Sequence, residues 1–435
     1  MILEPTIFAT IFLAVLTLII PGRFLLVPYV IAACFVPTDQ RIIIMGLDFT
    51  VLRVLVLIGV LRIFIRGEHI QISWHKFDQI IFAWLLCGAF VYVIQWMTLK
   101  AMINRAGFLF DALGLYWLFR QKIRSWADIK FAFSVLAFCI VLMAPLIALE
   151  FSTGRNPFVL MGRVITKQRE ERMRCQGAFP HSIMLGLFCA TLVPAFLTLA
   201  MLNKKKILYW LGAIAAVFIV IASASSTPIM VVAVVLVGMA FFKWRRYTAK
   251  AAWFVLVVLI ALHMLMQAPI WHLLARVNIV EGSTGYHRYK LIDQAIEHFD
   301  EWALIGSRST EHWGWGTGDI TNQYILEGVR GGFIALMFFV SMLYIAFKVS
   351  LESSLRTLTI QEQRISWCFF VMMLGHSVGF LGVSYFGQMT MLWFMMLIGI
   401  AFIFEAKLKA RYVRRKIFSM NNSLDCLAVS KSPGY

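Results

Sequence analysis

Three short segments bring together residue types that could bind a charged ligand. The first, residues 174–182, reads Arg-Cys-Gln-Gly-Ala-Phe-Pro-His-Ser and ends where an apolar run begins. An arginine presents a planar fork of donors that suits a diphosphate, and it stays charged at any relevant pH. Arg174 and His181 are therefore candidate ligands for an anion. The alternative for His181 is the first residue of a helix with no further role.

The second segment, residues 285–299, has the spacing of an amphipathic helix. Ile292, Ala295, Ile296 and Phe299 recur at intervals that place them on one helical face. Arg288 stands four residues before Ile292 and begins the same face. We expect its side chain to point toward the rest of the protein, as a buried ligand for a phosphate would. The alternative is an arginine that reaches lipid headgroups.

The third segment, residues 314–332, reads Gly-Trp-Gly-Thr-Gly-Asp-Ile-Thr-Asn-Gln-Tyr-Ile-Leu-Glu-Gly-Val-Arg-Gly-Gly. Its glycines allow close backbone approach, and the apolar run that follows would hold its polar residues at the start of a helix. Asn322, Tyr324 and Glu327 are the candidates that it offers. Taken alone, the segment is only a Gly-rich loop.

Patterns of other reaction classes are absent from the sequence. There is no HExxH, GxSxG or Walker A motif, and the seven cysteines show no C-x-x-C spacing. We therefore expect neither a metal site nor a cofactor, and soluble-type hydrolases, proteases and ATPases have no support.

The composition indicates which elements position these segments. Hydrophobic residues make up 61% of the chain and charged residues 14%, which excludes an ordinary soluble domain. Long apolar runs separated by short basic breaks are typical of membrane-spanning helices, whereas barrel strands would alternate. We expect an all-α, polytopic transmembrane helical bundle of about 12–13 spans with two large loops, the second containing amphipathic helices.

The basic residues indicate the orientation of this bundle. The net charge of +18 could suggest nucleic acid, but Lys and Arg mostly punctuate the apolar runs, so we expect no nucleic-acid partner. By the positive-inside rule, the side that carries the basic clusters is cytoplasmic. This predicts a multi-pass inner-membrane protein with a cytoplasmic C-terminus. The clusters lie at residues 62–76, 120–130, 204–206, 243–250, 348–364 and 407–416.

The expected organisation has six parts. They are N-terminal spans (1–150), a basic periplasmic loop (151–180), central spans (181–268), a large periplasmic loop (269–330), C-terminal spans (331–406) and a cytoplasmic tail (407–435). The first loop has the wrong charge for the outer side, because it contains Arg163, Arg169, Arg172 and Arg174. An anionic ligand or a lipid phosphate would explain this. A solvated basic face is the alternative.

Taken in order, the motifs resemble those of the O-antigen ligase and polymerase superfamily. The series is a basic outer loop ending in R-x-x-G-x-x-x-H, an S-x-S turn, a large outer loop with an internal arginine, and N-x-Y-x-x-x-E-G-x-x-G before the next span. The resemblance covers roughly residues 130–400. It implies metal-independent, inverting transfer of a glycan from undecaprenyl diphosphate at the periplasmic face.

The resemblance also implies roles and partners. Arg174 and Arg288 match the arginines that the family uses at the lipid diphosphate. The family's closing motif usually begins His-Asn, whereas this chain has Thr321 before Asn322. Glu327, Asp319 or His312 are then the candidates for a general base, and the alternative is a leaving group good enough to need little help from a base. The implied partners are an undecaprenyl-diphosphate-linked oligosaccharide, a growing polysaccharide acceptor, membrane lipid and a chain-length regulator protein.

Three functions remain open at this stage. The departure at Thr321 favours a polymerase of O-antigen or exopolysaccharide over a ligase that acts on a lipid or protein acceptor. A transporter or flippase of lipid-linked sugars is the rival from another class, although such folds commonly show related halves and no internal repeat is evident. A non-catalytic scaffold of a polysaccharide assembly complex is the third.

Overall fold

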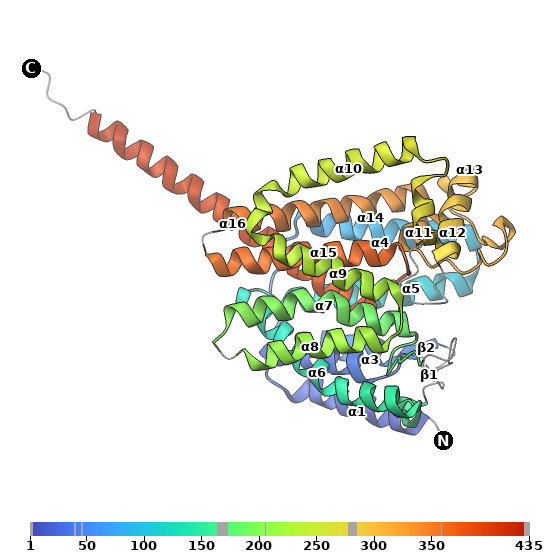
Figure 1. The fold of residues 1–435 in the computed structure, drawn as a ribbon. Coiled ribbons are helices and arrows are strands. Elements are labelled where there is room, and N and C mark those ends of the chain that lie inside the picture. The colour runs from blue at the N-terminus through green and yellow to red at the C-terminus, as the bar shows by residue number, and fades with distance from the viewer. Residues whose placement is uncertain are drawn as a thin grey trace, which may run out of the picture.

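A computed structural model describes residues 3–38, 41–44, 47–162, 173–204, 206–276, 285–357 and 359–429. Within these residues the chain is a bundle of helices with one short hairpin (Figure 1). The expectation of an all-α fold is therefore confirmed. Thirteen of the helices described below coincide with long apolar runs of the sequence.

These thirteen helices form the body of the molecule. They are α1 (Leu3–Ile19), α2 (Leu26–Phe35), α3 (Val51–Ile65), α4 (Lys76–Trp96), α5 (Leu99–Lys122), α6 (Trp126–Thr153), α7 (Ser182–Leu202), α8 (Ile207–Ala222), α9 (Ser226–Ala240), α10 (Thr248–Leu265), α14 (Gln323–Arg356), α15 (Ile360–Phe380) and α16 (Gln388–Val429).

Further helical segments connect them. They are the 3₁₀ turns η1 (Gly22–Phe24), η2 (Pro157–Met161), η3 (Phe241–Tyr247), η4 (Ile270–His272) and η5 (Glu311–Trp313), and the α-helices α11 (Leu273–Arg276), α12 (Gly285–Glu297) and α13 (Phe299–Ala303).

Burial differs sharply between the helices. Nearly every residue of α7 is buried, and this helix packs against α8, α9 and α15. No residue of α10 is buried, although the helix is strongly apolar. Within the described residues, six helical segments are long and apolar enough to cross a membrane, and α10 belongs to one of them. An exposed apolar helix of this kind is stable in lipid and costly in water.

The described parts of the two predicted loops lie at the same end of the bundle, here called the loop end. Figure 1 shows α11, α12, α13 and the hairpin there, while α16 extends from the opposite end. The hairpin pairs β1 (Arg41–Ile44) with β2 (Leu47–Thr50) in antiparallel register, Arg41 opposite Thr50. These strands were not predicted from the sequence. Three consecutive isoleucines favour an extended backbone here, because β-branched side chains fit a strand better than a helix.

The start of α14 corrects the predicted boundary of the large loop. The helix begins at Gln323, inside the segment that was expected to remain a loop until residue 330. The Asn322 side chain caps it by accepting a hydrogen bond from Ile325 N at 3.2 Å, which is a favourable way to begin a helix. Helix α14 is kinked further along, at Gly332, where φ is 69°. A side chain at this position would meet the carbonyl oxygen of Leu304.

The buried face of α12 also differs from the predicted one. Gly285, Arg288, Leu291 and Ala295 are buried, whereas Ile296 is 52% exposed. Phe299 lies beyond the end of α12 and is exposed as well. The start of the helix sets its rotation, since a side chain at Gly285 would lie 2.7 Å from the carbonyl oxygen of Leu274.

Candidate anion site

The end of the basic loop, residues 175–179, is fixed by buried hydrogen bonds. The Glu150 carboxylate, at the end of α6, accepts from the backbone N–H groups of Gln176 (3.1 Å) and Gly177 (2.9 Å). Asn156 Nδ2 donates to the carbonyl oxygen of Gly177 at 2.9 Å, and Gln388 Nε2 donates to that of Ala178 at 2.9 Å. This stretch is therefore held by side chains from three other segments.

These contacts place Arg174 beside the turn between α8 and α9. Arg174 Nη2 donates to Ser225 Oγ at 2.9 Å, and Cys175 N donates to the carbonyl oxygen of Ala222 at 3.1 Å. Between them Ala224 adopts φ 43°, a left-handed conformation that non-glycine residues rarely occupy. Ser225 belongs to the S-x-S turn of the motif series, but its contact with Arg174 was not predicted from the sequence.

Arg288 is buried beside the same arginine. Its residue is only 8% exposed, and its Nε atom is shielded from solvent and makes no hydrogen bond to any described residue. Burial lowers the pKa of Arg288, and the neighbouring charge of Arg174 lowers it further. The prediction that Arg288 points toward the rest of the protein is confirmed. A buried guanidinium next to a second one needs an anion to balance it.

Basic residues at the opposite end of the bundle have such partners. Arg62 pairs with Glu68 at 2.9 Å, and Lys122 pairs with the same carboxylate at 2.7 Å. Arg120 lies 3.3 Å from Asp78 and from Glu405. Among the described residues Arg288 has no comparable acidic neighbour, which distinguishes it from the cations that join helices.

Among the other predicted ligands of the anion, only His181 can be placed. His181 is exposed and caps α7, since its Nδ1 atom accepts from Ile183 N at 3.1 Å. This geometry agrees with the alternative of a helix-start residue. Arg163, Arg169 and Arg172 lie outside the described residues.

The residues proposed from the third segment lie in a different group. Tyr324 donates through its hydroxyl to the carbonyl oxygen of Ser377 at 3.1 Å. Glu327 accepts from Trp84 Nε1 at 2.7 Å and from Gln323 Nε2 at 2.6 Å. Asn322 forms the cap of α14. These contacts hold helices together, and they do not bring the three side chains to the arginine pair.

Two adjoining cavities lie beside this group. The inner one, of about 80 Å³, is lined by residues of α4, α5, α14 and α16, with Arg105 and Glu327 among them. The outer one, of about 460 Å³, opens among residues 307–320 of the large loop and is lined by Tyr92, Trp96 and Asp319. Leu326 and Arg330 line both.

The segment 381–388 connects the arginine pair with these cavities. On one side, a side chain at Gly382 would lie 2.6 Å from Thr227 Oγ1 at the start of α9, and Gln388 binds the loop that holds Arg174. On the other side, Tyr385 lines the inner cavity and donates its N–H to Gln323 Oε1 at 2.7 Å. Thus one short segment touches both regions.

No known family model matches this chain, and no curated protein sequence is similar to it.

Proposed function

We propose that this chain is a glycosyltransferase of the bacterial inner membrane that polymerises or transfers glycan units carried on undecaprenyl diphosphate. The observation that carries the proposal is the burial of Arg288 beside Arg174, with no acidic partner for Arg288 among the described residues, at the loop end of an apolar helical bundle. A lipid-linked diphosphate carries the charge that would balance Arg288, and its polyprenyl tail suits an apolar surrounding.

The leaving group explains why two arginines are useful. Transfer makes a bond between an acceptor hydroxyl oxygen and the anomeric carbon, and it breaks the bond from that carbon to the diphosphate oxygen. The electron pair of the broken bond stays on the diphosphate, where charge develops. Guanidinium groups fixed in a dry site stabilise this charge more strongly than mobile groups in water.

The outer cavity is the proposed site of the acceptor glycan. Tyr92 and Trp96 offer aromatic faces to sugar rings, and Arg308 and Asp319 offer polar groups. Asp319 is exposed, so its carboxylate could take the proton of the attacking hydroxyl. Glu327, in contrast, already accepts two hydrogen bonds in the inner cavity.

The proposed orientation follows from the distribution of charge and loops. The basic clusters join helices at the end opposite α11–α13, so that end is assigned to the cytoplasm. The loop end then faces the periplasm, where an undecaprenyl-linked substrate is accessible. In this orientation α16 leads to a cytoplasmic C-terminus.

The test is a comparison of Arg288→Ala with Arg155→Ala in cells that depend on this chain for their surface polysaccharide. Arg155 is an exposed arginine at the same end of the bundle and provides a matched control. We expect Arg288→Ala to stop polymer lengthening at normal protein abundance. Arg155→Ala should leave polymer length unchanged.

The location of unused lipid-linked units separates the competing functions. Accumulation on the periplasmic side supports transfer, whereas accumulation on the cytoplasmic side supports a transporter or flippase. Polymer of normal length in an Arg174→Ala, Arg288→Ala double variant would overturn the proposal.

A further inference from the structure

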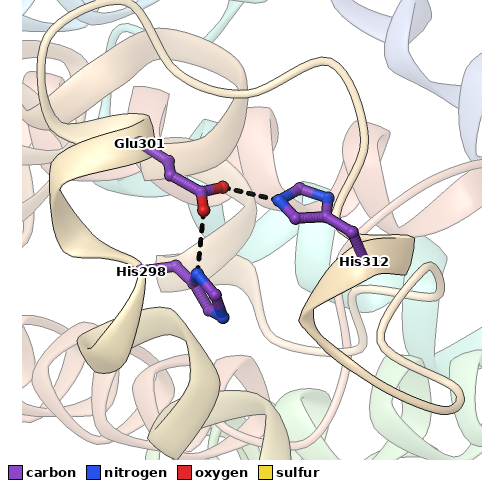
Figure 2. Close-up of side chains that lie close together, drawn as sticks. All are labelled: His298, Glu301 and His312. Carbon is purple, nitrogen blue, oxygen red and sulfur yellow. Dashed lines mark hydrogen bonds and ion pairs between the residues drawn. The ribbon is translucent and has the colours of Figure 1, made fainter.

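A second group of chemically active side chains lies in the large loop, where α13 and η5 meet. Figure 2 shows His298 and His312 on either side of Glu301. His298 Nδ1 is 2.8 Å from Glu301 Oε1, and His312 Nε2 is 2.6 Å from Glu301 Oε2. The three potential ligand atoms all lie within 4.8 Å of one another.

We propose that His298, Glu301 and His312 form a binding site for a divalent transition metal, of which Zn²⁺ is the reference ion. Two imidazoles and a carboxylate are a common ligand set for zinc. Ligand atoms that share a tetrahedral zinc ion lie about 3.4 Å apart, given metal–ligand distances of about 2.0–2.2 Å. Entry of the ion therefore needs only small outward shifts of the side chains that are now hydrogen-bonded.

The backbone presents the three ligands to one point. His298 stands at the break between α12 and α13, and Glu301 follows three residues later, on the same side of that turn. His312 comes from η5, so the third ligand arrives from a separate segment. Side-chain exposures of 30%, 34% and 54% leave the cluster accessible to an ion from solution.

Trp313 contacts two of the three ligands and fixes their orientation. Its residue is 3% exposed, and its Nε1 atom donates to Glu301 Oε2 at 2.9 Å. Its ring also stacks on the His298 ring, with centroids 5.4 Å apart and an interplanar angle of 1°. Groups that fix the orientation of the ligands in this way are typical of metal sites.

The site has a structural consequence for the large loop. Three protein ligands leave one coordination position to water, and a bound ion would tie η5 to the junction of α12 and α13. That junction follows Arg288 along α12, and η5 precedes Asp319. Metal binding is nevertheless independent of the proposed glycosyl transfer, and the test below measures binding alone.

The experiment uses the full chain in detergent, purified without a polyhistidine tag and treated with a chelator. Zn²⁺ is titrated by calorimetry, and Co²⁺ is added as a spectroscopic probe of coordination. We expect one zinc ion per chain, a tetrahedral Co²⁺ absorption band and a higher thermal midpoint with Zn²⁺. The His298→Ala, His312→Ala double variant should lose all three signals.

Two further variants secure the interpretation. His263→Gln, His272→Gln removes the same number of histidines near the start of the large loop and should bind zinc as the wild type does. If the double variant does not fold, His312→Asn replaces the most exposed ligand and should lower the affinity at least tenfold. The absence of saturable zinc binding by the wild type, or equal binding by the ligand variants, would overturn the proposal.

Discussion

Arg174 and Arg288 come from distant segments, yet their side chains lie close enough for the charge of Arg174 to lower the pKa of Arg288. Arg174 is anchored by Ser225, whereas the Nε atom of Arg288 is buried without a partner among the described residues. Burial of the Arg288 guanidinium beside a second cation is costly. A ligand with several negative charges that binds at Arg288 would offset this cost.

This relationship predicts a trade-off between stability and function at Arg288. Arg288→Gln removes an unbalanced buried charge, so we expect it to stabilise the free protein by about 1 kcal/mol and to raise the thermal midpoint by about 2 °C. The same variant should lose polymer lengthening. Differential scanning fluorimetry in detergent and polymer length in cells measure the two effects.

Arg155→Gln is the control for this prediction and should change neither quantity. A fall of several degrees in Arg288→Gln would mean that Arg288 stabilises the fold, and the interpretation as a ligand for an anion would then be wrong.

A second prediction concerns the ion pair between α3 and α5. Arg53 Nε and Nη2 contact the two oxygens of Asp111 at 2.9 and 2.6 Å, with side-chain exposures near 20%. Asp111→Ala removes two charge-assisted hydrogen bonds at a partly buried place and should cost about 1.5–3 kcal/mol. The Arg53→Leu, Asp111→Leu variant removes both charges and should recover most of the loss. The measurement is the thermal midpoint of the wild type, the single variant and the double variant. An equal fall of the midpoint in the single and double variants would contradict the prediction.

The sequence was most informative where apolar periodicity decides the structure. The long apolar runs became helices, and the inward direction of Arg288 followed from its position four residues before Ile292. The rotation of α12 was less well predicted, because close packing at Gly285 sets it and hydrophobicity alone does not show such a contact. For the same reason Ile296 was placed on the wrong face.

The candidate site was harder to predict because its parts are distant in the sequence. Nothing local indicates that Ser225 would meet Arg174, or that Glu150 would bind the backbone at Gln176 and Gly177. The capping role of Asn322 is a different case, because it was not predicted but could have been. An asparagine directly before an apolar run is a common helix cap, so the residues next to Asn322 already indicate this role.

The Glu150 contacts lead to a third prediction. Glu150→Ala leaves the N–H groups of Gln176 and Gly177 without this acceptor in a buried place, and each such loss costs about 1–3 kcal/mol. We expect a lower thermal midpoint and weaker polymer formation, although Glu150 is not proposed to touch the substrate. Limited proteolysis of Glu150→Ala should show new cleavage near residue 174. The control variant Glu362→Ala removes an acid from α15 instead and should show no new cleavage there. Normal protease resistance in Glu150→Ala would show that the loop is held by other means.

The last prediction separates the two carboxylates proposed for acceptor activation. Asp319 is exposed in the lining of the outer cavity, so Asp319→Asn should fold normally and slow transfer about 100-fold if this group accepts the proton. In Glu327→Gln, an amide N–H₂ replaces one of two buried acceptors, which should lower stability by about 1–3 kcal/mol through the contacts to Trp84 and Gln323. Transfer per folded molecule, measured with a purified lipid-linked donor, should then stay near that of the wild type. The opposite pattern, in which Glu327→Gln stops transfer at an unchanged thermal midpoint, would assign the base to the inner cavity and remove Asp319 from the reaction.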